Sequence, residues 1–252
     1  MMTTDARPLA AHVDEARRIL AAADSAGVTL RITGGVGVAL RCPSASAAPL
    51  ARDYADIDAV GRGGQRREIT ALFGELGYAG DDAFNALHGE SRLFFWDPAN
   101  ERQLDVFLDR VEMCHRIDLR GRLDVDAQTL TLADLLLMKL QVVETNDKDF
   151  TDMAALLVDQ QFADHDDGAI NVDYLCELAG HDWGLWRTMT MVAGRLETHS
   201  ATLGDDAIGA TVHEKVTVLL ERLDSAPKSR GWRLRSRVGD RVRWYELPDD
   251  DG

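Results

Sequence analysis

The sequence contains no run of 18 or more apolar residues, and only 28 basic residues stand against 43 acidic ones. The missing apolar run excludes a transmembrane helix, and the first 20 residues lack the layout of a signal peptide. The three cysteines lie far apart without a CxxC pair, and none of the seven histidines has a zinc-ligand spacing. We therefore expect a cytoplasmic protein with reduced thiols that does not act at a membrane.

The net charge of −15 argues against nonspecific binding of nucleic acid over the whole surface. The charge is unevenly placed, because residues 228–243 hold seven Lys or Arg and one Asp. This segment carries +6, which leaves −21 for the rest of the chain. Its alternation of apolar residues with arginines predicts a β-hairpin that has one arginine face.

Hydrophobic periodicity predicts an N-terminal part that mixes helices and strands. The expected helices cover residues 8–27 and 65–77 and a stretch after Gly34, and the expected strands cover 28–33, 54–60, 91–97 and 102–109. After residue 130 only helical patterns follow, at 131–144, 148–160, 172–180, 183–197 and 208–223. Thr131 and Asp134 are spaced like a capping box at the start of the first of these patterns.

These patterns favour the α+β class, with a small mixed sheet and flanking helices followed by a helical domain and a C-terminal β-hairpin. The expected domain boundaries give a mixed domain at 1–120, a helical domain at 121–227 and a basic hairpin tail with an acidic end at 228–252.

A glycine turn and three aspartates are the candidate site. Gly34 and Gly35 end the strand "VTLRIT" before a predicted helix, and such a turn lets backbone N–H groups approach a phosphate. Asp56 and Asp58, in "DIDAV", project from the same face of the next strand. Their two negative charges repel each other unless a cation lies between them. Asp105 lies among apolar residues of a later strand, where solubility does not explain it.

Carboxylate oxygens suit Mg²⁺, which usually keeps phosphate oxygens and waters as its other ligands. Metal ions held by these three aspartates, beside a turn that grips a triphosphate, would orient a hydroxyl toward the α-phosphate and stabilise the leaving pyrophosphate. The pattern therefore predicts the transfer of a nucleotide from an NTP to a hydroxyl acceptor.

The order "GGVGVAL…RDYADIDAV…LDVF" resembles the polymerase β-like nucleotidyltransferase superfamily, and is most similar to the abortive-infection toxin type of bacterial nucleotidyltransferase. The resemblance implies a nucleotidyltransferase fold, with Asp56, Asp58 and Asp105 as catalytic metal ligands. It also implies a helical domain that closes over the nucleotide. A toxin–antitoxin role, with an antitoxin protein as partner, comes with the same resemblance.

The same resemblance implies further nucleotide-binding residues. Arg52 stands four residues before the first aspartate, at a position where these relatives often carry an arginine. Lys139 and the step "KDFTD", with Lys148, Asp149 and Asp152, match a helical lysine motif and the basic-Asp-x-x-Asp step that follows it. We expect Lys139 to neutralise phosphate charge and Arg52 to hold the loop or a phosphate.

Several simpler interpretations stay open at this stage. Lys139 could place its stem in the core and its amine in solvent, and the residues of "KDFTD" could be a surface charge pair. Gly35, Gly37 and a later acid imitate a dinucleotide-binding fingerprint, although Leu40 occupies the third glycine position. A catalytically inactive nucleotide-binding or interaction protein with the same fold is the main alternative.

The acceptor is likewise open between RNA, such as a tRNA end, and a small molecule or a protein side chain. The arginines of the tail favour RNA, whereas the acidic body favours the other acceptors. The tail arginines could instead form ion pairs within the chain or a contact between subunits. The tail arginines in question are Arg233, Arg235, Arg237, Arg241 and Arg243.

Overall fold

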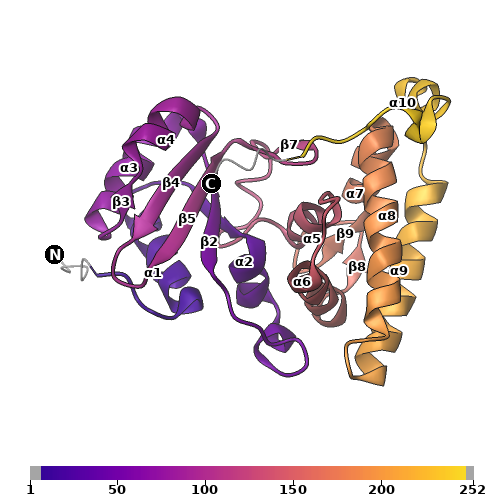
Figure 1. Ribbon diagram of the computed structural model, residues 1–252, viewed down its shortest axis with the longest axis horizontal. Coiled ribbons are helices and arrows are strands. Elements are labelled where there is room, and N and C mark those ends of the chain that lie inside the picture. The colour runs from indigo at the N-terminus through magenta and orange to yellow at the C-terminus, as the bar shows by residue number, and fades with distance from the viewer. Residues whose placement is uncertain (1–6, 248–252) are drawn as a thin grey trace. The chain divides into compact units, whose positions relative to one another are not determined.

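The computed structural model describes residues 7–247, which divide into two compact units (Figure 1). The first unit comprises the chain up to Leu40 together with Asp53–Val111 and Ile117–Leu130. The second comprises Arg41–Arg52, Glu112–Arg116 and the chain from Thr131 onward. The chain thus passes into the second unit early, at the loop before Asp53, which a boundary at residue 120 does not anticipate.

The first unit is built on a five-stranded mixed sheet, whose strand order is β1-β2-β5-β4-β3. Only β2 and β5 pair in parallel, and the other neighbours are antiparallel. The strands predicted at 28–33, 54–60, 91–97 and 102–109 are confirmed within a few residues, whereas β3 was not expected. The bounds are β1 Leu30–Thr33, β2 Asp56–Gly61, β3 Ala79–Gly80, β4 Arg92–Asp97 and β5 Arg102–Leu108.

Helices α1 (His12–Ser25) and α3 (Arg66–Glu75) cover one face of this sheet. Alternation sends Ile57, Leu104 and Val106 toward these helices, where all three are fully buried. Helix α2 (Gly34–Arg41) starts directly where β1 ends, as expected from the sequence. The short α4 (Asp82–His88) lies beside β4 and was not predicted.

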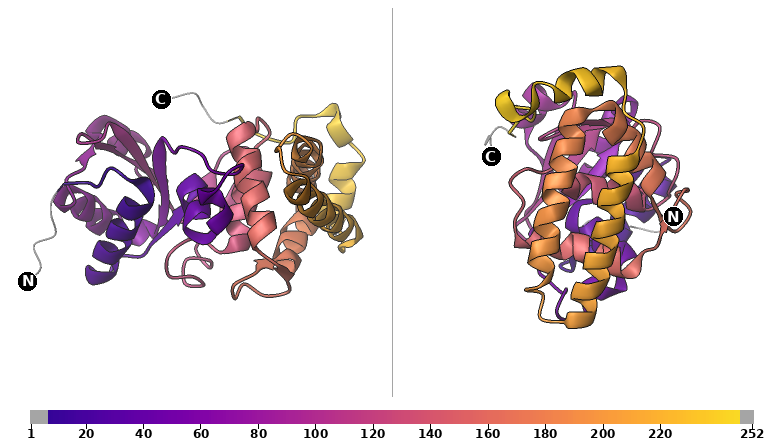
Figure 2. Two further views of the ribbon diagram at one scale, coloured as in Figure 1. Left: turned by 90° about the horizontal axis from the view of Figure 1, so that it is seen from below. Right: turned by 90° about the vertical axis from the view of Figure 1, so that its right-hand side faces the viewer.

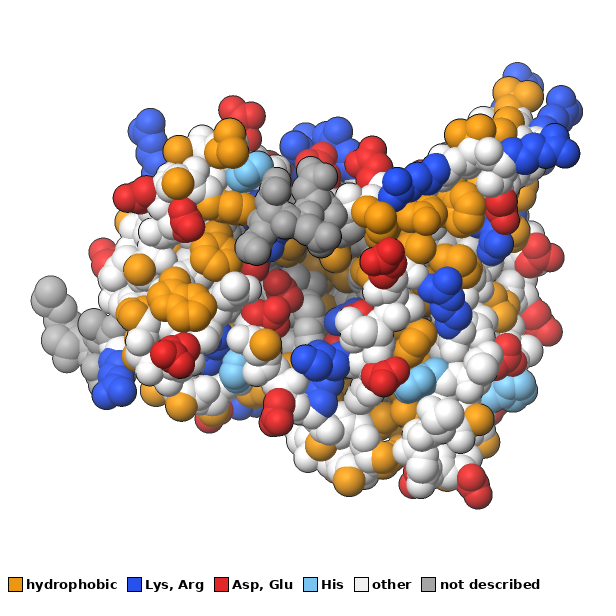
Figure 3. Space-filling view, in the orientation of Figure 1, with side chains coloured by type: hydrophobic (Ala, Val, Ile, Leu, Met, Phe, Trp, Pro, Cys, Tyr) orange, Lys and Arg blue, Asp and Glu red, His pale blue; other side chains and the backbone are white. Residues whose placement is uncertain are grey.

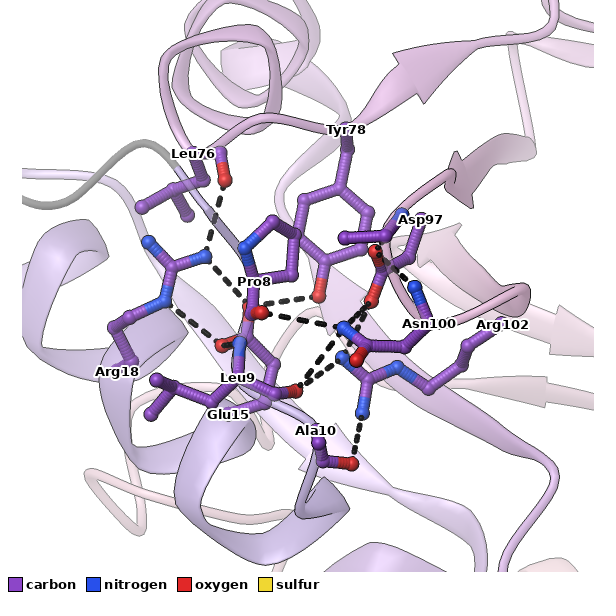
Figure 4. A network of polar contacts seen from close by, with 11 residues as sticks. Pro8, Leu9, Ala10, Glu15, Arg18, Leu76, Tyr78, Asp97, Asn100 and Arg102 are labelled. Carbon is purple, nitrogen blue, oxygen red and sulfur yellow. Dashed lines mark hydrogen bonds and ion pairs between the residues drawn. The ribbon is translucent and has the colours of Figure 1, made fainter.

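A buried polar network ties the N-terminal segment to the end of the β4–β5 hairpin (Figure 4). Arg102 Nη2 lies 2.7 Å from Asp97 Oδ2 and donates to the carbonyl of Leu9 at 3.0 Å. Glu15 accepts from the Tyr78 hydroxyl at 2.8 Å, and burial together with the Glu15 charge raises the pKa of Tyr78 above its ordinary value. Each buried charge of the network is therefore compensated by a partner in hydrogen-bonding distance.

The second unit is helical, with α8 and α9 running side by side (Figure 2). The five predicted helical patterns are all confirmed, and Thr131 caps α5 by accepting from the Asp134 N–H at 3.2 Å. The helices are α5 Leu132–Leu140, α6 Asp147–Asp159, α7 Val172–His181, α8 Trp183–Ser200, α9 Asp206–Ser225 and α10 Arg230–Ser236. Small elements complete the chain: β6 Arg110–Glu112, β7 Arg116–Asp118, β8 Phe162–Ala163, β9 Ile170–Asn171, η1 Pro43–Ser46, η2 Gly63–Gln65 and η3 Gly239–Arg241.

The predicted C-terminal β-hairpin is wrong, because residues 230–236 form α10 instead. Ser229 caps this helix by accepting from the Trp232 N–H at 3.1 Å. Arg235 turns inward, donates to the carbonyls of Gly239 and Val242 at 2.8 Å each, and lies over the Trp183 ring. These tertiary contacts override the alternation that suggested strands. The predicted acidic end at 248–252 lies outside the described residues.

The extended segment after η3 is anchored to α8 by a buried hydroxyl. Trp244 Nε1 donates to Thr188 Oγ1 at 3.0 Å, and the same oxygen lies 2.8 Å from His115 Nε2. Burial lowers the pKa of His115, which favours a neutral ring whose Nε2 can accept a hydrogen bond from the Thr188 hydroxyl. Within the described residues, no helix is long and apolar enough to cross a membrane.

The Arg102–Asp97 pair should be essential to the first unit. Both side chains are at most 2 % exposed, so Arg102→Met leaves a buried carboxylate that has lost its cation. We expect a loss of about 3 kcal/mol or more in the free energy of unfolding, measured by urea denaturation. Arg17→Met, which removes an exposed ion pair to Asp14, should cost almost nothing. Equal effects of the two substitutions would show that the network is not stabilising.

Candidate functional site

The three predicted aspartates lie together on the sheet face that points away from α1 and α3. In the parallel register Asp58 is directly opposite Asp105, and Asp56 precedes Asp58 by two residues on the same face. Neighbouring strands are about 4.8 Å apart, so the backbones of Asp58 and Asp105 approach to about that distance. Asp56 is exposed, Asp58 is half-buried and Asp105 is only 5 % exposed.

The glycine turn contacts the middle aspartate of this group. Thr33 pairs with Asp58 across β1 and β2, and Gly34 follows with a φ of +62°. A Cβ at position 34 would lie 2.2 Å from Asp58 Oδ2, so glycine is required both by the backbone conformation and by this close approach. The side chain of Asp58 therefore lies against the first residue of α2.

Arg92 joins this site, although the sequence analysis did not identify it. Its Nε lies 2.8 Å from Asp105 Oδ1, and its guanidinium lies over the rings of Phe84 and Phe107. The sequence does show that Arg92 shares a face with Phe94 and Trp96, because the three residues occupy every second position of β4. Finding it requires the β4–β5 register, in which Phe94 pairs with Asp105.

The residues fit a magnesium ion that takes only part of its ligands from the protein. Within residues 7–247, no group of three or more His, Cys, Asp or Glu side chains is arranged to hold a metal ion. Mg²⁺, however, is commonly held by one or two carboxylates plus phosphate oxygens, and Asp56 and Asp58 offer such hard donors side by side. The Thr33 hydroxyl, buried next to Asp58 without a hydrogen-bond partner among the described residues, adds an unsatisfied polar group.

Four of the predicted nucleotide-binding residues form a second cluster, which lies within the second unit. Arg52 binds Asp152 with two contacts, from Nε to Oδ1 at 2.8 Å and from Nη2 to Oδ2 at 2.7 Å. Lys139 Nζ lies 2.9 Å from Asp149 Oδ1 and 2.8 Å from Asp152 Oδ2. Asp149 and Asp152 can both reach Lys139 because a spacing of three residues puts them on one face of α6.

The cluster is a compensated ion network of two cations and two anions. Burial alone would lower the pKa of Lys139, but the charges and hydrogen bonds of Asp152 and Asp149 raise it above the ordinary lysine value. Lys139 is thus not a lysine that extends its amine into solvent. Lys148 is not part of the cluster, since it is exposed at the start of α6, where its N–H donates to Asn146 Oδ1.

No protein-family model matches the chain, and a comparison with curated proteins finds no match. Among solved structures, the chain is similar to the antibiotic-resistance factor ANT(2'')-Ia, with 18% identity and a TM-score of 0.38. The match covers 58% of this chain and 82% of that chain. A likeness as distant as this gives no information about the activity of the chain.

The contact between Gly34 and Asp58 can be tested by measuring the free energy of unfolding of variants. Gly34→Ala should destabilise the first unit more than Gly27→Ala, by about 1 kcal/mol or more, in urea denaturation. The two glycines share a positive φ, +62° and +67°, but the space around Gly27 is open to 4 Å. Adding Asp58→Ala to Gly34→Ala should recover most of the difference. Equal costs for the two single variants would contradict the close approach.

The ion network predicts a large cost for removing its central cation. Lys139→Met leaves Asp152, 2 % exposed, and Asp149 with less positive charge, so we expect a loss of about 3 kcal/mol in unfolding free energy. Lys148→Met, at an exposed position, should stay within about 0.5 kcal/mol. Because the pKa of Lys139 is raised, its contribution is complete below the ordinary lysine pKa and is lost only as the pH rises through the folded value. The cost should therefore be the same at pH 6 and pH 8, and a strong pH dependence in that range would contradict the assignment.

Proposed function

We propose that this protein is a magnesium-dependent nucleotidyltransferase that moves a nucleoside monophosphate from an NTP to a hydroxyl acceptor. The observation that carries the proposal is the placement of Asp58 directly opposite Asp105, with Asp56 on the same face and the Gly34 turn against Asp58. Carboxylates at the end of a glycine turn and a helix N-terminus suit a metal–triphosphate substrate.

In this proposal each residue has a defined part. Asp56 and Asp58 would hold Mg²⁺, which when bound supplies positive charge to the phosphates and to the leaving pyrophosphate. Backbone N–H groups of Gly34 and Gly35 would donate to phosphate oxygens, and the Thr33 hydroxyl lies next to them. Asp105 would align the acceptor hydroxyl and take its proton, which requires that its carboxylate be released from Arg92.

The reaction balances without a further reactant. The acceptor oxygen forms a bond to the α-phosphorus, and the bond from the α-phosphorus to the bridging oxygen of the β-phosphate breaks. Pyrophosphate leaves, and the hydroxyl proton passes to Asp105.

In the second unit, a phosphate contact by Lys139 or Arg52 would require that the phosphate replace a carboxylate of their network.

For the acceptor, we propose RNA, with a small molecule as the second candidate. Four of the five tail arginines, Arg233, Arg237, Arg241 and Arg243, are exposed and suited to phosphate contacts. Arg235 is used inside the fold and is withdrawn from this set. Within this segment, the acidic residue Asp240 forms an ion pair with Arg187 of α8.

A transfer assay tests the proposal. Wild type, Asp58→Asn and Asp24→Asn would be incubated with each α-labelled NTP, with Mg²⁺ or EDTA, and with cell extract separated into RNA, protein and small-molecule fractions. We expect Mg²⁺-dependent label in one fraction, RNA first, with wild type and with Asp24→Asn, whose substituted side chain is exposed on α1. Asp58→Asn should lower the rate at least about 100-fold, because metal stabilisation of the transition state amounts to several kcal/mol.

The opposite results are equally informative. Wild-type activity in Asp58→Asn, or transfer in EDTA, would overturn the metal assignment. Nucleotide binding without transfer in any fraction would favour the inactive nucleotide-binding alternative.

A further inference from the structure

The strand register places an exposed tryptophan in line with the first aspartate. Asp56 on β2 pairs with Gln103 on β5, and Gln103 pairs with Trp96 on β4, so the three side chains leave the same face in one row. Two strand spacings separate Asp56 from Trp96, or about 10 Å. Figure 3 shows acidic side chains gathered over β2 and hydrophobic ones over β4 and β5 on this face.

Trp96 differs from the other four tryptophans in having no aromatic partner among the residues that the structure describes. Trp183 packs edge-to-face with Trp244, and Trp186 with Trp232. Trp96 is 38 % exposed, and within residues 7–247 no ring stacks on its indole and no side chain bonds its Nε1. Aromatic pairing and hydrogen bonding within the described residues therefore do not account for a large aromatic residue at this place.

The neighbours of Trp96 leave its ring accessible. Ala79 on β3 pairs with it from the outer side, and Gln103 lies on the inner side, and both are exposed. The nearby Phe94 is different, since it already packs against Phe84 with 5.9 Å between the ring centroids. Of the aromatic side chains on this part of β4, Trp96 is thus the one that can receive a planar ligand.

We propose that Trp96 stacks on the base of the nucleotide substrate, and this inference rests on the proposed function. With the phosphates at Asp56, Asp58 and the Gly34 turn, the ribose carries the base away from the carboxylates, and the row through Gln103 leads to the indole. A stacked base contributes binding through its π-face rather than through its edge, so all four bases are accepted. The residue sets affinity for the nucleoside part and makes little distinction between bases.

The test compares nucleotide with base-free triphosphate. Binding of ATP, CTP and inorganic tripolyphosphate, each with Mg²⁺, would be measured by calorimetry for wild type, Trp96→Ala, Trp96→Phe and Leu87→Ala. Leu87 is the matched control, because it is an exposed apolar residue of the same unit, 77 % accessible on α4. Trp96→Ala should weaken ATP and CTP binding at least about fivefold and leave tripolyphosphate binding unchanged.

Trp96→Phe should restore most of the lost affinity, and Leu87→Ala should have no effect. Unchanged nucleotide binding in Trp96→Ala would overturn the inference, as would an equal loss for tripolyphosphate. The proposed function fails separately if Asp58→Asn, measured in the same way, binds the three ligands as well as wild type does. Absence of all binding would overturn both.

Discussion

The parallel pairing of β2 with β5 is the constraint on which the candidate site depends. Ile57 and Leu104 lie opposite each other and are fully buried, so the hydrophobic face of each strand fixes the register. A shift by one residue would turn the aspartates of β2 toward the core and its apolar side chains outward. The same register brings Asp58 to Asp105, and the neighbouring β1 then brings Gly34 to Asp58. The same strand register therefore determines both the packing of the core and the arrangement of the acidic residues.

Compensation of buried carboxylates is the second theme, and it takes different forms in the two units. Asp152 is held by two cations, Arg52 and Lys139, in a network whose charges balance. Asp105 is held by Arg92, whose side chain is 42 % exposed and can therefore move away without opening the core. The first arrangement is suited to stability. The second leaves a carboxylate that Arg92 can release, as the proposed role of Asp105 as proton acceptor requires.

Most helices and strands could be predicted from the sequence, because strands show alternation and helices show a periodicity of about 3.6 residues in their apolar positions. Asp56, Asp58 and Asp105 could be placed on one sheet face for the same reason. Arg92 could not be assigned, since its contact depends on the register of β4 against β5, and the partner of Lys139 depends on how α6 packs. The tail shows the limit most clearly: Trp232 and its neighbours alternate like a strand, but contacts of Trp232 and Arg235 with α8 make the segment helical.

In the proposed function, Asp56 and Asp58 would hold a divalent cation together with a nucleotide. The most direct measurement is a crystal structure of the protein grown with Mn²⁺ and a non-hydrolysable NTP analogue, with anomalous scattering used to place the metal. We expect a manganese peak between these two carboxylates, with the phosphates against the Gly34 turn. Nucleotide bound elsewhere, or manganese absent from these carboxylates while the nucleotide is present, would contradict it.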